Sequence, residues 1–113
     1  MAKSNKPIFW SLFAAGGTLA AFLAPALALL FLMAALGHAP ALLSYDKLHH
    51  FAAGWFGKLF LFGVITLFLW HAAHRLRVTM HDIGLRQDSI VAVVVYLVAA
   101  AGTLTTLLCL IRI

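Results

Sequence analysis

The sequence predicts an all-α membrane protein with three transmembrane helices, because it is strongly apolar and contains three long apolar runs. Of its 113 residues, 65% are hydrophobic and 10% are charged, and the mean hydropathy is +1.05. A soluble domain of this length cannot bury so much apolar surface, since small folds bury a low fraction of their area. A membrane helix needs roughly 20 apolar residues. We therefore expect a single membrane-anchor domain, residues 1–113, with helices at about 9–36, 51–80 and 89–111.

The first helix is predicted from an uncharged stretch: no Lys, Arg, Asp or Glu lies between Pro7 and Tyr45. Pro25 removes a backbone donor and should bend the helix. A cleaved signal peptide is the alternative, since Ala26-Leu27-Ala28 resembles a cleavage site. The run is longer than the roughly 7–15 residues of a signal h-region, so we expect a retained helix. The exit loop is marked by turn-forming residues: Gly37, Pro40 and Ser44.

The second and third helices complete the predicted fold. Lys58 should lie about two turns inside the second helix, where its stem can reach the membrane surface or meet another chain. Cys109 lies in the third apolar run and is read as a small hydrophobic residue. Small residues four apart allow close backbone approach in lipid, so we expect them to contact other chains. They are Gly17 with Ala21, the series Ala20, Ala24 and Ala28, Ala99 with Thr103, and Gly102 with Thr106.

Basic residues predict the orientation, because cytoplasmic loops carry an excess of Lys and Arg. One side of the predicted fold would carry Lys3, Lys6, Arg75, Arg77 and Arg86. The other side would carry Lys47, Lys58 and Arg112. The first side should therefore face the cytoplasm, which places the N-terminus in the cytoplasm and the C-terminus in the periplasm. The net charge of +5 fits this topology and anionic headgroups better than nucleic acid, and we expect no nucleic-acid partner.

A polar stripe closes the second helix. At about 100° per residue, five side chains share a stripe roughly 120° wide. They are His71, His74, Arg75, His81 and Asp82, whereas Arg77 lies outside the stripe. Titratable groups at a membrane boundary are costly without partners, so this stripe is the candidate functional surface.

Four interpretations of the stripe remain open. The first is an ordinary basic helix end that reaches the headgroups. The second is one axial ligand to a haem shared with another subunit, although haem is not expected, because the first and third helices contain no histidine. The third is a transition-metal site at His71 and His74, which lacks further ligands nearby, so no metal is predicted.

The fourth interpretation is a site for a quinone. Histidine can supply or accept a proton near neutral pH, and arginine can stabilise a developing negative charge. His74 and Arg75 supply these groups where a lipid-soluble molecule would meet water. Trp10 should lie at the same membrane face, where it is otherwise an ordinary interfacial residue.

Several segments resemble the D subunit of bacterial quinol:fumarate reductases. They are Pro7–Gly17, Ala24-Pro25, Leu43-Ser44-Tyr45, Gly57–Phe62, Leu69-Trp70, His74-Arg75 and Met80-His81-Asp82. They cover most of the chain from Pro7 to Asp82, in order and with matching spacing. His71 departs from the pattern, since the best-known member of the family has no histidine there.

The resemblance implies a non-catalytic membrane-anchor subunit of an oxidoreductase complex in a bacterial inner membrane. Its partners would be a second anchor (C), an iron–sulfur subunit (B) and a flavoprotein (A). The iron–sulfur subunit would hold the clusters, and the flavoprotein would hold the flavin. Menaquinol would be oxidised, in respiration with fumarate, at a site shared by the iron–sulfur protein and both anchors. Trp10, His74 and Arg75 match residues that line or flank that site, while His71 and His81 are possible proton relays. The alternatives are a small transporter and a purely structural anchor.

Overall fold

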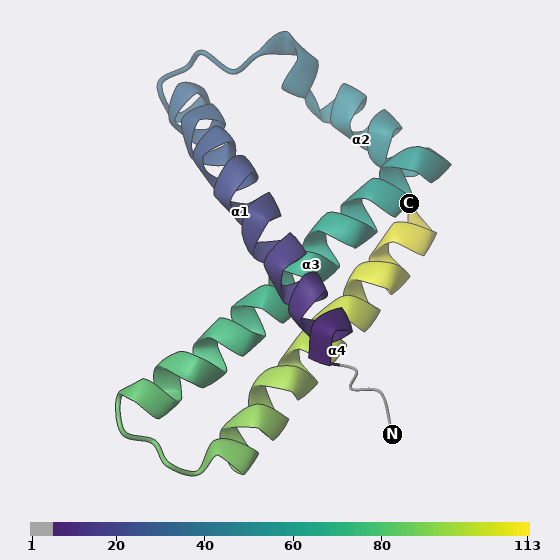
Figure 1. Ribbon diagram of the computed structural model, residues 1–113. Coiled ribbons are helices and arrows are strands. Elements are labelled where there is room, and N and C mark those ends of the chain that lie inside the picture. Colours follow the sequence, from purple (N-terminus) through teal and green to yellow (C-terminus); the bar gives the residue numbers. More distant parts are fainter. Residues whose placement is uncertain (1–5) are drawn as a thin grey trace.

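The computed structural model describes residues 6–113, and that part of the chain is built entirely from helices and their connections (Figure 1). The elements are α1 (Lys6–Ala35), the short 3₁₀ helix η1 (Ala41–Leu43), α2 (Tyr45–Ala53), α3 (Trp55–Asp82) and α4 (Asp88–Arg112). Three of them, α1, α3 and α4, are long and apolar enough to cross a membrane. The predicted number of membrane helices is therefore confirmed. Lys3 lies outside the described residues.

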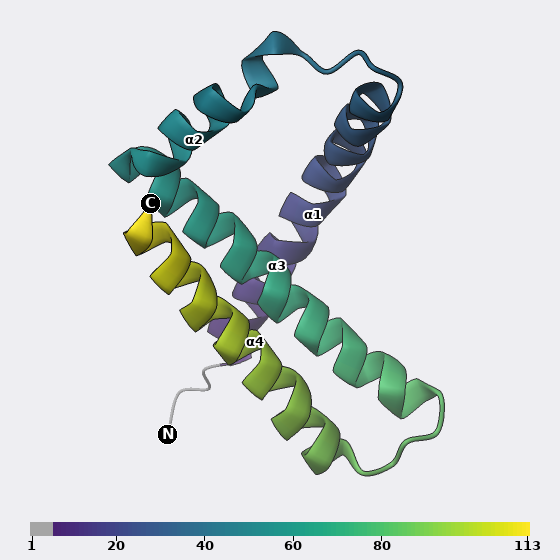
Figure 2. The same cartoon turned by 180° about the vertical axis from the view of Figure 1, so that it is seen from behind.

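The three long helices form a hairpin with a crossing helix. α3 and α4 run antiparallel, side by side along their whole length, and α1 crosses α3 so that its second half diverges from the hairpin (Figures 1 and 2). Buried apolar residues are few and lie mainly in the α3–α4 seam: Ala73, Val95 and Ala99. Most large apolar side chains are exposed, which suits a chain whose surroundings are lipid and other subunits.

Two glycines set the distance between α1 and α3. Gly16 is buried, and a Cβ atom added there would lie 2.7 Å from the carbonyl oxygen of Leu67. A Cβ atom at Gly17 would lie 2.7 Å from Cε1 of His71. The helices approach this closely because neither residue carries a side chain. α1 continues as a helix through Pro25.

Small residues also line the α3–α4 seam. Ala99 is only 2% exposed, and a Cβ atom at Gly102 would lie 2.9 Å from Cδ1 of Leu69. The indole Nε1 of Trp70 donates to Thr103 Oγ1 at 3.1 Å, which links the two helices by a polar contact. The expectation that Ala99, Gly102 and Thr103 contact other chains is therefore corrected, because they contact α3 of their own chain. The same correction holds for Gly17, which packs on His71 of α3.

Glycine ends both α1 and α3. Gly37 and Gly84 have φ angles of 81° and 103°, a region that residues with a Cβ atom rarely adopt. At each of these helix ends, the N–H of the glycine and the N–H of the next residue donate hydrogen bonds back to the last turn. His38 N–H donates to Met33 O at 2.8 Å, and Leu85 N–H donates to Met80 O at 3.0 Å. These bonds give hydrogen-bond donors to carbonyl groups of the last helical turn that would otherwise have none.

The predicted start of the second membrane helix was wrong. A separate short helix, α2, occupies residues 45–53, and the chain is extended at Gly54, with φ −71° and ψ 152°. A Cβ atom at Gly57 would overlap the carbonyl oxygen of Phe51, so glycine at this position allows α2 to fold back against α3. Because α3 begins at Trp55, Lys58 lies in its first turn and not two turns inside the helix.

Candidate functional site

The α1–α3 crossing joins the first predicted histidine to the backbone of α1. Nδ1 of His71 lies 3.0 Å from the carbonyl oxygen of Phe13. A carbonyl oxygen can only accept, so the ring nitrogen donates and carries a hydrogen. Gly17 leaves the space that the ring occupies, because α1 presents no Cβ atom there. His71 is thus held by the helix crossing and not directed freely into solvent.

The second histidine faces the opposite neighbour, α4. Nδ1 of His74 lies 3.0 Å from the hydroxyl oxygen of Tyr96. Nη1 of Arg77 donates to the same hydroxyl oxygen at 3.4 Å. Arg77 also donates through Nε to Asp88 Oδ1 at 2.9 Å, and through Nη2 to Oδ2. A planar guanidinium engaging a carboxylate with two parallel hydrogen bonds has a fixed direction. The hairpin therefore carries a continuous polar network from the α4 N-terminus to His74.

The aromatic ring of Phe13 connects the two histidines. It stacks on His71 with a centroid distance of 4.5 Å and meets His74 edge-on at 4.6 Å. The ring of Trp10 lies 5.5 Å from the Phe13 ring, and Trp10 is 65% exposed. α1 therefore brings an exposed indole to the same cluster as both imidazoles. We call Trp10, Phe13, His71, His74 and Tyr96 the histidine cluster.

The predicted stripe is split in this structure. His71 and His74 belong to the histidine cluster, which Trp10 joins from α1. The other members, Arg75, His81 and Asp82, are exposed, and their side chains have no hydrogen-bond partner within residues 6–113. Arg77, which lies outside the stripe, faces α4 and forms the ion pair.

Phe13, Tyr96 and Asp88 were not predicted from the sequence as members of this region. A hairpin register was the available signal. His74 lies eight residues before the end of α3, and Tyr96 lies eight residues after the start of α4. In an antiparallel pair joined by a short loop, such positions face each other at the same depth. Asp88 is the first residue of α4, where a carboxylate suits the positive end of the helix dipole.

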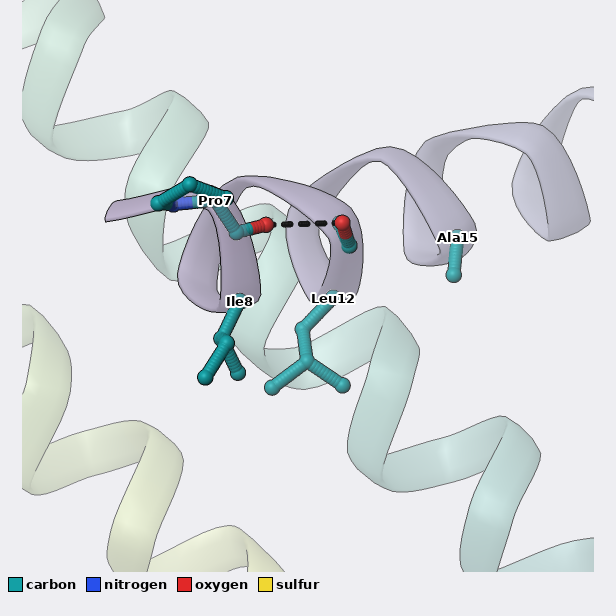
Figure 3. Close-up of a pocket in the computed structure, with 5 residues that line it drawn as sticks. Pro7, Ile8, Leu12 and Ala15 are labelled. Carbon is teal, nitrogen blue, oxygen red and sulfur yellow. Dashed lines mark hydrogen bonds between the residues drawn. The ribbon is translucent and has the colours of Figure 1, made fainter. Parts of the chain in front are cut away.

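An open, apolar depression on α4 is lined by Ala92, Val93, Tyr96 and Leu97, so Tyr96 of the histidine cluster borders it. A second open, apolar depression lies along the first turns of α1, lined by Pro7, Ile8, Ser11, Leu12 and Ala15 (Figure 3). Ser11 Oγ donates to the Pro7 carbonyl oxygen at 2.7 Å, which occupies the one polar side chain (Figure 3). At about 100° per residue, Ile8 and Leu12 point away from the face that carries Gly17. This depression is therefore separate from the histidine cluster.

Metal ligation has limited support here. Within residues 6–113 no group of three or more His, Cys, Asp or Glu side chains is arranged to hold a metal ion. The Nδ1 atoms of His71 and His74 are engaged with different helices, α1 and α4. A metal shared between these two atoms does not fit that geometry.

Known proteins resemble the chain along almost its whole length. The family of fumarate reductase D subunits matches residues 1–111. The fumarate reductase D subunit of Vibrio parahaemolyticus is 39% identical over 107 residues, covering 93% of this chain and 84% of the relative. Those of Vibrio cholerae and Photobacterium profundum are 42% and 40% identical over 83 residues, covering 72% of this chain and 64% and 69% of the relatives. The segments that the sequence analysis compared with this family lie inside the matched range, and the chain belongs to the family of fumarate reductase D subunits.

Proposed function

We propose that this chain anchors the catalytic subunits of a fumarate reductase to the bacterial inner membrane and contributes to its menaquinol-oxidation site. The flavoprotein and iron–sulfur subunits would hold the flavin and the clusters, and a second hydrophobic subunit would complete the anchor. Family membership favours this role over that of a small transporter.

The exposed apolar surface supports the anchoring role. α1 contacts the rest of the chain mainly through its first half, and exposed side chains such as Phe22, Leu29 and Phe31 cover its second half. Ala24 and Ala28 are also exposed there and could admit a close helix from another subunit. A membrane helix is stable in lipid without such a partner, but association adds packing contacts that lipid does not provide.

We place the hairpin loop of residues 83–87 and the start of α1 in the cytoplasm, and the C-terminus in the periplasm. The hairpin loop lies at one end of the fold and the α1–α2 connection lies toward the other, while α1 begins beside the hairpin (Figures 1 and 2). Arg75, Arg77 and Arg86 cluster near that first end, which supports this orientation by the excess of basic residues on cytoplasmic loops.

The single observation that supports the quinol role most strongly is that one aromatic cluster joins Trp10 to His74. Nε2 of His74 and Nε1 of Trp10 have no hydrogen-bond partner among the described residues, so both remain available to a ligand. Menaquinol supplies electrons and protons when it is oxidised. The apolar surface of α1 would accommodate its tail, and Trp10 would pack against its ring.

Individual residues have separate proposed tasks. His74 would hydrogen-bond an oxygen of the headgroup, and exposed Arg75 would stabilise negative charge nearby. His71 and exposed His81 remain proposed proton relays toward the loop. Because the cluster is open in this chain, the iron–sulfur subunit and the second anchor would close the site around the headgroup.

His74→Ala tests the quinol role in the intact complex. The complex should assemble in the membrane and reduce fumarate normally with a soluble dye as electron donor. Its menaquinol oxidation should fall roughly a hundredfold, the low end of the range for lost acid–base groups. His50→Ala is the matched control, because His50 is exposed on α2, far along the chain from the cluster. Unchanged menaquinol oxidation in both His74→Ala and Arg75→Ala would leave only the structural anchor.

Deletion of this chain tests the anchoring role separately. The flavoprotein and iron–sulfur subunits should then appear in the soluble fraction after cell lysis. Complete retention in the membrane fraction would contradict the anchoring proposal.

A further inference from the structure

We infer that Tyr96 is a positioning residue that holds His74 with its ring hydrogen on Nε2. The functional consequence rests on the proposed quinol site, whereas the position of the hydrogen follows from the contacts of Tyr96. Those contacts come from α3 and leave a single consistent arrangement of donors.

The hydroxyl of Tyr96 has two polar neighbours. Nδ1 of His74 lies 3.0 Å from its oxygen, and Nη1 of Arg77 lies 3.4 Å from it. A guanidinium is always a donor and never an acceptor, so Arg77 donates to the phenol oxygen. Among residues 6–113, the phenol hydrogen then has one acceptor within reach, which is Nδ1 of His74. A neutral imidazole that accepts at Nδ1 carries its hydrogen on Nε2.

The reverse arrangement leaves a donor unused. If Nδ1 of His74 carried the hydrogen, the Tyr96 oxygen would accept from both neighbours. Its own hydrogen would then have no acceptor within residues 6–113. An unpaired polar hydrogen in a half-buried site beside lipid is unfavourable. The network therefore selects the arrangement with the hydrogen on Nε2.

Other contacts hold Tyr96 and Arg77 in place. The Tyr96 ring stacks on Trp70 with a centroid distance of 5.9 Å, and the guanidinium carbon of Arg77 lies 5.7 Å from the ring centroid. Asp88 fixes Arg77 through two hydrogen bonds. The start of α4 thus fixes the direction in which Arg77 donates. The hydrogen bond from Arg77 to the Tyr96 oxygen then leaves the Tyr96 hydroxyl hydrogen to donate to His74.

His71 provides a contrast within the same cluster. Its Nδ1 faces the carbonyl oxygen of Phe13 and must donate, so the neutral His71 ring has a bare Nε2. His74 has the opposite arrangement, although both rings contact Phe13. The cluster therefore offers a quinol headgroup a hydrogen-bond donor at Nε2 of His74 and an acceptor at Nε2 of His71.

The test removes the hydroxyl and keeps the ring. Tyr96→Phe in the intact complex should retain the stacking on Trp70 and normal dye-linked fumarate reduction. Menaquinol oxidation should fall roughly two- to tenfold, the range expected for one hydrogen bond. Tyr45→Phe is the matched control, since Tyr45 is exposed on α2 and its ring stacks on the ring of His49. Tyr96→Phe with unchanged menaquinol oxidation, in a complex where His74→Ala abolishes it, would overturn the positioning role alone.

A second variant separates positioning from packing. In His74→Gln the amide nitrogen can donate near the position of Nε2 without any help from a phenol. Tyr96→Phe should therefore cause no further loss in the His74→Gln background. Losses that simply multiply in the double variant would mean that Tyr96 acts independently of His74, and would overturn the inference.

Nitrogen-15 NMR of histidine-labelled complex gives a readout that does not depend on turnover. The difference spectrum between the wild type and His74→Gln isolates the His74 signals. It should show a hydrogen on Nε2 in the wild type and a mixture of both neutral forms in Tyr96→Phe. A wild-type signal with the hydrogen on Nδ1 would overturn the inference. If instead His74→Ala leaves menaquinol oxidation intact while the Nε2 signal is found, the proposed quinol role fails and the assignment of the hydrogen stands.

Discussion

Gly17 and His71 are in contact across the α1–α3 crossing: a Cβ atom at Gly17 would lie 2.7 Å from Cε1 and 3.3 Å from Nδ1 of the imidazole. The ring fits there only because α1 has no side chain at that position. The same ring donates to the carbonyl oxygen of Phe13 at 3.0 Å. Helix packing and the hydrogen bonding of His71 are therefore set by the same residue.

Gly17→Ala should displace the His71 ring and weaken its bond to Phe13, at a cost of about 1 kcal/mol. Gly16→Ala should cost more, about 1–3 kcal/mol, because a backbone carbonyl is the near neighbour and cannot rotate away. The readout is the temperature at which the detergent-solubilised complex releases this subunit. Gly63→Ala is the control, since nothing lies within 4 Å of a Cβ atom there. Equal effects of all three substitutions would contradict the proposed role of the crossing.

The fold was largely predictable from sequence, for a local reason. Each membrane helix is specified by the length of its own apolar run, so the number of spans follows without knowledge of the packing. α2 was missed because Tyr45–Ala53 is short and amphipathic, and a hydropathy pattern does not separate it from the run that begins at Phe51. The fold-back of α2 against α3 depends on Gly57, whose effect is a close backbone approach and not a change in hydropathy.

Only the part of the candidate site that α3 contributes was predictable from the sequence. His71 and His74 could be placed on one face of a helix, because that follows from the helical period. Their partners come from other helices, so they depend on where α1 crosses and on the hairpin register. Tyr96 looked like one more large residue in an apolar run, and Arg77 looked peripheral because it lies outside the stripe. Both become central once α4 lies beside α3.

Removal of the Trp70–Thr103 bond should loosen the hairpin measurably. Thr103→Val keeps the shape of the side chain but leaves Nε1 of Trp70 without its acceptor. Polar contacts between membrane helices average about 0.6 kcal/mol, so the free energy of unfolding in mixed micelles should fall by about that amount. Thr105→Val is the control, because Thr105 Oγ1 is exposed and bonds only its own helix, at Ala101 O. A loss in the control as large as that in Thr103→Val would argue against a specific contact.

Trp10→Ala should impair reactions with menaquinol more than dye-linked fumarate reduction. The indole is exposed and reaches the histidine cluster only through Phe13, so its removal should leave the fold of α1 intact. Steady-state rates with both electron donors, measured on the same membranes, give the comparison. Trp55→Ala provides a control, because Trp55 also carries an exposed indole and lies at the start of α3. Parallel losses with both donors would indicate general misassembly.

The proposed orientation of the chain predicts which loops a membrane-impermeant thiol reagent reaches. In a Cys109→Ser background, Ser44→Cys should react from the periplasmic side of spheroplasts, and Gln87→Cys should react only after the membrane is opened. Both native residues are exposed in loops or helix ends, so access depends on the side of the membrane. The opposite labelling pattern would reverse the proposed topology. It would also place the histidine cluster nearer the periplasmic face, away from the cytoplasmic face at which the iron–sulfur subunit is proposed to bind.

A structure of the purified complex with a quinone-site inhibitor bound would show whether His74 contacts the headgroup. We expect inhibitor density beside Trp10 and His74, with Nε2 of His74 within hydrogen-bond distance of an inhibitor oxygen. Density enclosed wholly by other subunits, with the His74 ring turned away from it, would mean that this chain does not contribute to the quinol site.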